Sequence, residues 1–336
     1  MKEALLYDRL PGDRVQCRLC NHGCVIGEAK RGICGVRENR GGTLYTLVYE
    51  RLIARNADPI EKKPMFHFAP GSKSFSIATP GCNFRCDFCQ NYEISQMPRD
   101  RDLIAGEEVS PQEAVDEAVR RKCKTISYTY TEPTIYFEYA LDIARLATAA
   151  GLKNIFVTNG YMTEDALKAI HPDLHGANVD LKAFREDFYQ KRCGGKLDGV
   201  LRSLRVMKDL GVWVEITTLI IPGLNDSEEE LEELARFIVS LGPEVPWHIS
   251  RFHPMYKMLD RSPTSVGMLE RARQIGIDAG LRYVYTGNVP GDTGEDTFCF
   301  QCGQLLVDRF GFQIGRYEIK NSKCPQCGAA INGVDL

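Results

Sequence analysis

From about residue 73 to residue 288, short β-rich runs alternate with amphipathic helical runs, and this alternation limits the possible folds most strongly. Repeated strand–helix units are joined by right-handed crossovers and build a parallel sheet. Six or seven such units can curl into a full or partial (β/α) barrel, whose active site lies at the carboxyl ends of the strands. The predicted strands are residues 74–79, 125–131, 154–160, 177–184, 213–221, 247–253 and 281–287.

Residues typical of helix starts support the same organisation. Ser110 precedes a proline and a helical run, so it is the expected N-cap of a first helix. A second helical run covers 133–151, and a third covers 225–242. Asp226 or Ser227 is the expected cap of the third, whose first turn is acidic and therefore complements the helix dipole. These segments supply the helical half of the repeating units.

Polar residues gather where the predicted strands end. In the run 177–184, apolar residues alternate with Asn178, Asp180 and Lys182, although a parallel strand covered by helices should be almost wholly apolar. Glu132 precedes a proline, which favours extended backbone at the end of its strand. Two further strands each carry a pair of polar residues on one face; the pairs are Glu215 with Thr217 and Arg251 with His253. We therefore expect a polar pocket here, the alternative being strand ends that simply meet solvent.

Three cysteines follow the first predicted strand, with gaps of three and two residues: Cys82, Cys86 and Cys89. A zinc ion normally takes four protein ligands, and the next cysteine along the chain is the distant Cys123. An iron–sulfur cubane can be held by three thiolates if another group occupies its fourth iron. The spacing therefore favours a cluster with one open position over a zinc site or a chance grouping.

The segment CNFRCDFC matches the CxxxCxxC signature and resembles the radical S-adenosylmethionine (radical SAM) enzymes, including the aromatic Phe88 before the last cysteine. The resemblance implies a [4Fe–4S] cluster on Cys82, Cys86 and Cys89. It also implies that the amino and carboxylate groups of S-adenosylmethionine (SAM) bind the remaining iron. One electron from the cluster would then cleave SAM to methionine and a 5′-deoxyadenosyl radical that abstracts hydrogen from a substrate.

Within that family, residues 60–290 resemble the pyruvate formate-lyase activating enzyme branch, through GCNFRCDFCQN, the EP at a strand end, DLK and IPGLND. The flanking cysteine motifs resemble the AmmeMemoRadiSam subgroup. One departure concerns a Gly-Gly-Glu motif of the branch that contacts the SAM amino group. Here Tyr130 and Thr131 stand where the glycines would be, and Glu132 aligns with the acid.

The resemblance implies a set of SAM contacts at the carboxyl ends of the strands, and an electron donor such as flavodoxin or ferredoxin. Lys182 would supply positive charge to a carboxylate, while its structural alternative is a stem packed along the barrel. Histidine and asparagine at such positions are also often purely structural. The residues implied as SAM contacts are Phe88, Thr131, Glu132, Asn159, Asp180, Lys182 and His253.

Two CxxC pairs near the C-terminus, each followed by glycine, are typical of a zinc ribbon: Cys299, Cys302, Cys324 and Cys327. Four thiolates of this kind form a closed structural site, so the ribbon predicts stability or docking rather than catalysis. Its residues are only mildly basic, so a protein contact is favoured over nucleic acid.

A second group of four cysteines lies near the N-terminus: Cys17, Cys20, Cys24 and Cys34. Four thiolates within eighteen residues can hold one metal ion, and nearby glycines let the chain wrap tightly. Zinc is the favoured ion, and the alternative is an extra iron–sulfur cluster that relays electrons to the central one. Cys123 and Cys193 are expected to be buried or incidental thiols, with Cys193 as a candidate to face substrate.

The chain of 336 residues is longer than a usual single domain, and 43% of it is hydrophobic, which suffices for a sizeable core. We expect a Cys-rich module at 1–60, a barrel at 61–290 and a zinc ribbon at 291–336. The net charge of −3 argues against a general nucleic-acid surface. No apolar run reaches about 18 residues, and the charged N-terminus lacks a signal-peptide core, so a cytoplasmic location without membrane contact is expected.

Three functions compete. The favoured one is a radical SAM enzyme acting on an unidentified small molecule, peptide or protein. A close variant is an activase that installs a glycyl radical on a partner protein. A different class, an iron–sulfur and zinc electron carrier or scaffold, would not need a large barrel with a polar pocket.

Overall fold

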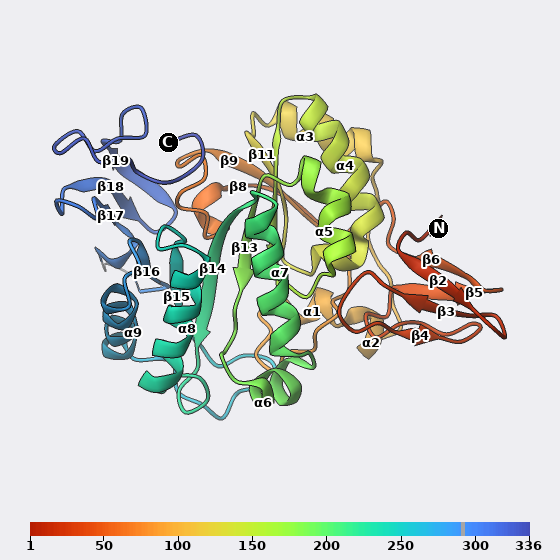
Figure 1. Ribbon diagram of the computed structural model, residues 1–336. Helices are drawn as coiled ribbons and strands as arrows, with labels where there is room; N and C mark the ends of the chain where they lie inside the picture. Colours follow the sequence, from red (N-terminus) through yellow and green to blue (C-terminus); the bar gives the residue numbers. More distant parts are fainter. Residues whose placement is uncertain (290–292) are drawn as a thin grey trace.

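The computed structural model describes residues 1–289 and 293–336, and its largest element is an eight-stranded sheet in the order β16-β15-β14-β13-β12-β11-β9-β8 (Figure 1). Seven of these strands are parallel neighbours, so the predicted partial (β/α) barrel is confirmed. The strands are β8 (Ala54–Pro59), β9 (Lys73–Ala78), β11 (Thr125–Tyr128), β12 (Lys153–Thr158), β13 (Gly176–Asp180), β14 (Trp213–Ile220), β15 (Trp247–Arg251) and β16 (Val284–Gly287).

The edge strand β8 is antiparallel to β9 and was not among the predicted strands. Its sequence ARNADP lacks the β-branched and aromatic residues that mark a strand. It pairs over six positions, from Ala54 opposite Ala78 to Pro59 opposite Lys73. The proline at the end of an edge strand loses no hydrogen bond that a central strand would require. The predicted division at residues 60 and 61 therefore falls directly after a strand of the main sheet.

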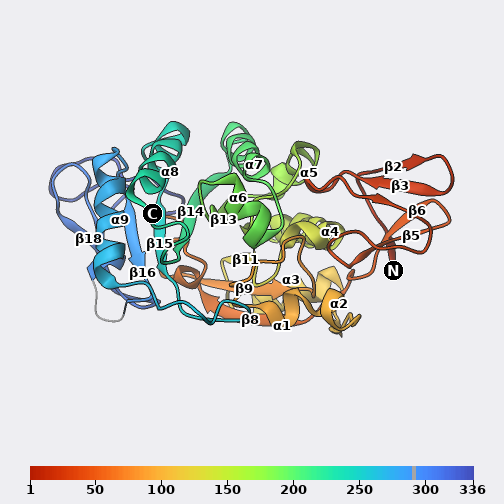
Figure 2. The same cartoon turned by 90° about the horizontal axis from the view of Figure 1, so that it is seen from below.

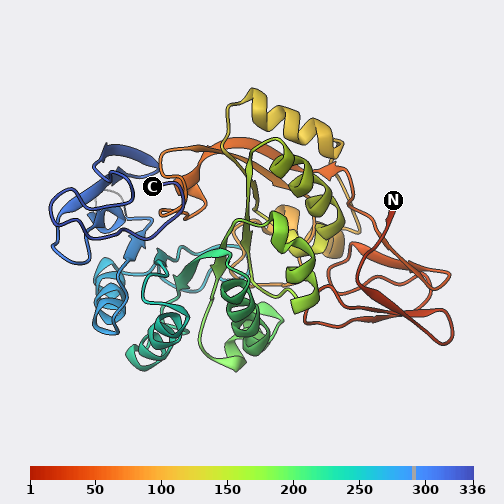
Figure 3. The same cartoon turned by 45° about the horizontal axis from the view of Figure 1, so that its top comes forward.

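Helices cover the outer face of the sheet in an arc, which Figure 3 shows. Ser110 caps the first of them with a complete capping box, in which its hydroxyl accepts from Glu113 N and the Glu113 carboxylate accepts from Ser110 N. Ser227 caps α8 by accepting a bond from Glu230 N. The larger helices are α3 (Pro111–Arg120), α4 (Phe137–Ala149), α5 (Glu164–Ile170), α7 (Leu197–Asp209), α8 (Glu228–Leu241) and α9 (Val266–Asp278).

Short helices lie mostly in the loops between strands and larger helices. They are α1 (Tyr92–Ser95), α2 (Met97–Asp100), α6 (Glu186–Phe188), the 3₁₀ turns η1 (Ile60–Lys62), η2 (Pro133–Tyr136), η3 (His171–Asp173) and η5 (Thr293–Glu295), and the π turn η4 (Tyr189–Cys193). In the described part of the chain, no helix combines the length and apolar character needed to cross a bilayer.

Small antiparallel sheets flank the barrel at opposite ends of the molecule (Figures 1 and 2). The N-terminal strands pair as β1-β6-β5 and β2-β3-β4, and β7 pairs with β10; the C-terminal strands pair as β17-β18-β19. Their bounds are β1 (Lys2–Glu3), β2 (Tyr7–Leu10), β3 (Arg14–Cys17), β4 (Val25–Ile26), β5 (Arg37–Arg40), β6 (Thr43–Thr46), β7 (Arg51–Leu52), β10 (Glu107–Glu108), β17 (Thr297–Phe298), β18 (Leu305–Phe310) and β19 (Gln313–Tyr317).

The last residues of the chain return to the barrel, because Val334 forms a parallel bridge with Phe68. The predicted boundary between residues 290 and 291 lies outside the described residues. The three-part division of the chain therefore stays a prediction.

Candidate active site

A cavity of about 480 Å³ opens at the carboxyl ends of the barrel strands. Nine of the ten side chains predicted for the cluster and for SAM line it. They are Cys82, Cys86, Phe88, Cys89, Thr131, Glu132, Asn159, Asp180 and Lys182. This volume falls within the usual range for small-molecule sites, about 300 to 1,000 Å³. The parallel sheet explains the convergence, since its carboxyl ends all meet at one edge.

The three-cysteine loop runs from the end of β9 to α1 and is tied to the segment around η4. Arg85 N donates to Cys193 O at 2.8 Å, and Asp87 N donates to Arg192 O at 3.0 Å. Within the loop, Phe84 N donates to Cys82 Sγ at 3.3 Å. The bond to Cys82 Sγ and the backbone bonds to the segment around η4 hold the three-cysteine loop with its sulfur atoms toward the cavity.

Burial raises the pKa of Cys82 and of Cys89, so these thiols need a positively charged partner to become thiolates. For Cys86 the neighbouring Cys193 is the largest cause of a raised pKa, followed by burial. Cys193 is fully buried and is not among the residues that line the cavity, so it lies behind Cys86 and does not face substrate.

The donor set fits a cluster held by three thiolates. Of the cysteines in the described ranges, only Cys82, Cys86 and Cys89 line this cavity. The trio also does not close to the tight spacing of a single-ion site, which among the described residues is reached only by the C-terminal cysteines. Three thiols that face an open cavity, Cys86 buried and the other two half-buried, therefore match a group larger than one ion with one position free for a ligand.

Glu132 lies almost fully buried at the cavity wall and accepts four hydrogen bonds. Its Oε1 accepts from Thr134 N at 3.0 Å, from Thr134 Oγ1 at 2.5 Å and from Thr158 Oγ1 at 2.7 Å. Its Oε2 accepts from Asn159 N at 2.8 Å. Burial raises the pKa of Glu132 although these donors oppose the shift. The carboxylate is thus fixed in place, and Oε2 keeps a lone pair free for a further donor.

Tyr130 explains how the chain departs from the glycine-containing motif. Its φ of 63° lies in the left-handed region that favours glycine, and Thr131 N donates to Thr129 O at 2.7 Å across it. The Tyr130 hydroxyl donates to Asp58, whose carboxylate also accepts from Lys63 Nζ at 2.7 Å. These bonds anchor the ring, so the backbone turn persists without glycine. Because the turn begins at residue 129, β11 ends at Tyr128 and not at the predicted residue 131.

Asn159 connects Glu132 to the three-cysteine loop. Its Nδ2 donates to Asn83 Oδ1 at 2.7 Å and lies 3.8 Å from Cys82 Sγ. Its own Oδ1 accepts from Tyr161 N at 3.0 Å. Any displacement of Glu132 would therefore be transmitted to the first cysteine.

Asp180 and Lys182, at the end of the neighbouring strand β13, form an ion pair with Lys182 Nζ 2.7 Å from Asp180 Oδ2. The ammonium lies 5.9 Å from the centre of the Phe88 ring. Burial lowers the pKa of Lys182, but Asp180 and nearby Cys86 outweigh burial, so the net pKa is raised and the side chain stays a cation. A fixed cation here suits a bound carboxylate.

His253 is the predicted site residue that the structure does not bring to the cavity. Its side chain is exposed, because β15 already ends at Arg251. There the chain leaves the sheet, held by Arg251 Nε donating to Thr264 O at 2.8 Å and Phe252 N donating to Thr264 Oγ1 at 3.0 Å. Arg251 is likewise absent from the cavity lining.

The sequence analysis missed His248 and Tyr285, which do line the cavity. Their rings stack at a centroid distance of 5.2 Å. His248 lies within the predicted strand 247–253, but the two-residue alternation puts it on the face opposite to Arg251 and His253, so it was missed because the wrong face was taken to meet the cavity. Tyr285 has no signal of its own, because aromatic residues are common in strands.

Glu215 is wholly buried beneath the cavity and was predicted to face it. Its carboxylate accepts from Phe66 N at 3.0 Å, from His67 N at 2.9 Å and from His248 Nε2 at 2.7 Å. Asn178 Nδ2 adds a bond to Pro64 O at 2.8 Å. These strand residues hold the segment 60–68 across the base of the cavity, and we call it the floor segment. Its Glu61, Lys62, Lys63, Pro64 and Phe66 all line the cavity.

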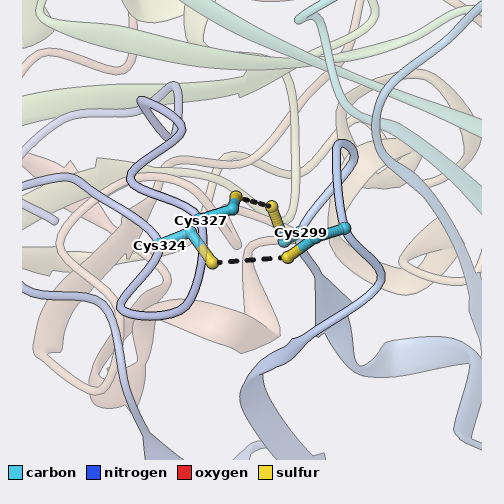
Figure 4. A group of neighbouring side chains, drawn as sticks. Cys299, Cys324 and Cys327 are labelled. Carbon is cyan, nitrogen blue, oxygen red and sulfur yellow. Dashed lines mark hydrogen bonds between the residues drawn. The ribbon is translucent and has the colours of Figure 1, made fainter.

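The four C-terminal cysteines converge at the spacing of a metal site: the ligand atoms of Cys299, Cys302, Cys324 and Cys327 all lie within 4.8 Å of one another. The Sγ atoms of Cys299 and Cys327 are 3.6 Å apart, and those of Cys302 and Cys324 are 3.7 Å apart. Figure 4 shows these side chains pointing toward one another. Zinc–sulfur bonds of about 2.3 Å in a tetrahedron place sulfur atoms about 3.8 Å apart, so the group fits one metal ion.

The four N-terminal cysteines also come together, around a separate small cavity of about 20 Å³. They are Cys17, Cys20, Cys24 and Cys34, and all are free thiols. Cys123 is a buried thiol.

Comparison with known proteins agrees with this geometry. The sequence profile of the Radical SAM superfamily matches residues 76–238. An uncharacterized protein of Methanocaldococcus jannaschii is 44% identical over 335 residues, 99% of each chain. A GTP 3′,8-cyclase of Pelotomaculum thermopropionicum is 26% identical and covers 69% of this chain and 77% of its own. A pyruvate formate-lyase-activating enzyme of Clostridium pasteurianum is 28% identical, covering 48% of this chain and 67% of its own.

Solved structures support the fold. A radical SAM methyltransferase from Sphaerobacter thermophilus superposes with a TM-score of 0.53 at 19% identity, covering 71% of each chain. The matched segment spans the three-cysteine loop and the strands β11, β12 and β13, whose carboxyl ends are followed by Glu132, Asn159 and Lys182. Residues 76–238 of the chain therefore form a domain of the radical SAM superfamily, with which the fold and the donor set agree.

Proposed function

We propose that this chain is a radical SAM enzyme that cleaves SAM and abstracts a hydrogen atom from a substrate bound in the same cavity. The observation that carries the proposal is the set of three thiols, Cys86 buried and Cys82 and Cys89 half-buried, which are the only cysteines of the described chain that line the cavity. Family membership implies a [4Fe–4S] cluster and SAM. When bound, these groups supply reductive cleavage of the sulfonium, which yields methionine and a 5′-deoxyadenosyl radical.

The residues of the chain would bind and orient these groups. Cys82, Cys86 and Cys89 are the cluster ligands. Glu132 accepts from the SAM amino group through the free lone pair on Oε2, and Lys182 offers its ammonium to a carboxylate. Phe88 lies beneath that ammonium and presents an apolar face to the adenosyl group.

The test is anaerobic reconstitution with iron and sulfide, followed by SAM and a chemical reductant. Methionine and 5′-deoxyadenosine are expected in equal amounts from the wild type. Cys86→Ala should form neither product, whereas the control Cys123→Ala, a buried thiol outside the cavity, should form both. Wild-type protein that takes up only zinc at Cys82, Cys86 and Cys89 and yields neither product would overturn the proposal.

The substrate is a small molecule or a protein side chain that reaches the floor segment. Lys63 and His248 line the cavity together with Phe312 of the C-terminal strands, so the pocket extends beyond the three-cysteine loop toward that module. A glycyl-radical activase is the second candidate, favoured by the similarity to the Clostridium enzyme. Deuterium transfer from a labelled candidate into 5′-deoxyadenosine separates the two, because an activase would take it from a partner's backbone glycine.

The four C-terminal cysteines are proposed to hold zinc as a structural ion, since their spacing suits a tetrahedron of thiolates. The electron donor is proposed to be a small redox protein such as flavodoxin or ferredoxin. Metal analysis of protein purified without added metal checks the first point, with about one zinc per chain expected.

A further inference from the structure

The N-terminal cysteines surround a cavity that the radical SAM reaction does not use. Cys17, Cys20, Cys24 and Cys34 line it together with Arg37. Cys17 N donates to Cys24 O at 2.9 Å, so the chain folds back on itself between these thiols. The four are therefore placed around one volume by the backbone, independently of any bound group.

The spacing of these thiols differs from that of a zinc site. Tetrahedral zinc holds thiolate sulfur atoms about 3.8 Å apart, and the C-terminal group has closed to 3.6 and 3.7 Å. In the described chain only that group has all its ligand atoms within 4.8 Å, so the N-terminal thiols stand farther apart. The same is true of Cys82, Cys86 and Cys89, which face the radical SAM cavity. Wider spacing suits a cluster of several metal atoms.

Two buried donors at this cavity lack acceptors. Arg37 is 2% exposed, and its Nη atoms bond Glu138 and Leu5 O, but its Nε has no partner. Asn83 is 1% exposed, and its Nδ2 also has no partner. A buried donor left unpaired costs roughly 1–3 kcal/mol. Anionic sulfur at the centre of the cavity would satisfy both, and hydrogen bonds to sulfur are typical of iron–sulfur sites.

The cavity adjoins the three-cysteine loop directly. Asn83 lines the N-terminal cavity and is the next residue after Cys82. His22, on the same wall, lies 2.9 Å from Asn83 O through Nε2. A side chain at Gly81 would come within 3.4 Å of Cys34 O, so the two segments pack without a gap.

We propose that Cys17, Cys20, Cys24 and Cys34 hold a second iron–sulfur cluster, next to the site formed by Cys82, Cys86 and Cys89. Arg37 and Asn83 donate to its sulfur atoms. The proposal replaces the zinc ion expected from the sequence, and it does not depend on SAM cleavage.

The test uses the full chain with Cys82→Ala/Cys86→Ala/Cys89→Ala, reconstituted anaerobically with iron and sulfide in the presence of zinc. About four iron atoms and four sulfides per chain are expected to remain, the content of one cubane. The converse variant Cys20→Ala/Cys24→Ala should lose about half of the wild-type iron, and the control Cys123→Ala should lose none. A triple variant that is fully folded by circular dichroism but holds no iron, or that binds a second zinc ion beyond the one expected at the C-terminal cysteines, overturns the proposal.

Electron paramagnetic resonance of the reduced wild type gives a second readout. A signal broadened by spin–spin interaction is expected, because Asn83, which lines the N-terminal cavity, directly follows Cys82 in the chain. The broadening should vanish in either variant. If the trio holds no cluster, wild type and triple variant will contain equal iron, which distinguishes failure of the proposed function from failure of this inference.

Discussion

Replacing Glu132 with glutamine tests the most heavily bonded group of the active site. Glutamine offers one acceptor oxygen and one NH₂ group. If its oxygen takes the place of Oε1 and keeps the Thr134 and Thr158 donors, its NH₂ group faces Asn159 N, which is itself a donor. One buried N–H is then unpaired at a cost of about 1–3 kcal/mol. The reverse orientation leaves more donors unpaired and costs more.

The assay is thermal unfolding of the reconstituted protein by circular dichroism, together with SAM affinity by calorimetry. A destabilisation of 1–3 kcal/mol corresponds to a fall in Tm of roughly 1 to 4 °C for a chain of this size, whose unfolding entropy is about 2.1 cal/mol/K per residue. Loss of the charged acceptor for the SAM amino group should weaken binding about tenfold to a hundredfold. The exposed capping-box variant Glu113→Gln is the control, since glutamine serves that role equally well. Unchanged Tm and unchanged SAM affinity in Glu132→Gln would refute the reasoning.

Three further predictions follow from groups near the cavity and from the ribbon. Tyr130→Phe removes the hydroxyl that donates to Asp58, whose pKa is held low by Lys63 and Tyr130 against burial. The variant should lose about 1 kcal/mol of unfolding free energy, measured by urea unfolding at pH 7. This loss should shrink as the pH falls below 3.8, the ordinary pKa of the aspartate, and a loss that stays constant with pH would contradict the prediction. Burial lowers the pKa of Lys63 from 10.5 to about 8, although its partner Asp58 opposes the shift. Between pH 8 and pH 10.5 the unfolded chain therefore binds more protons than the folded chain, so the free energy of unfolding should rise with pH over this range. Proton titration of the Lys63 amine by NMR checks the pKa, and an ordinary value near 10.5 would contradict it. Cys302→Ser should release the C-terminal ion and lower Tm, as zinc analysis and calorimetry would show, whereas retention of a full equivalent of zinc would count against a four-thiolate site.

Local sequence signals predicted the architecture well where they were strong. All seven predicted parallel strands exist, because β-branched runs between helices leave few other arrangements. β8 was missed because its pairing depends on β9 and not on its own residues. His253 was placed in the pocket because β15 was predicted two residues too long. Strand ends are set by contacts such as Arg251 with Thr264, which no local pattern reveals.

Cys82, Cys86 and Cys89 line the cavity, as their spacing predicted, because this prediction depends only on residues close together in the sequence. The turn at Tyr130 could not be foreseen, since a tyrosine tolerates φ of 63° only with the distant Asp58 to anchor it. The floor segment escaped notice for the same reason, because its position depends on contacts distant in the sequence. The bonds of Glu215 to Phe66 and His67 join residues about 150 positions apart, at separations of 149 and 148.

The floor segment and the three-cysteine loop are separate stretches of the chain, 60–68 and 82–89, on either side of β9. β9 lies between them and fixes their relative position, and Glu215 in β14 and Asn178 in β13 hold the floor segment by hydrogen bonds. Substitutions at the floor residues that line the cavity can therefore alter which molecules fit there while the three-cysteine loop, on the other side of β9, keeps its sequence, provided that Glu215 and Asn178 remain to hold the segment.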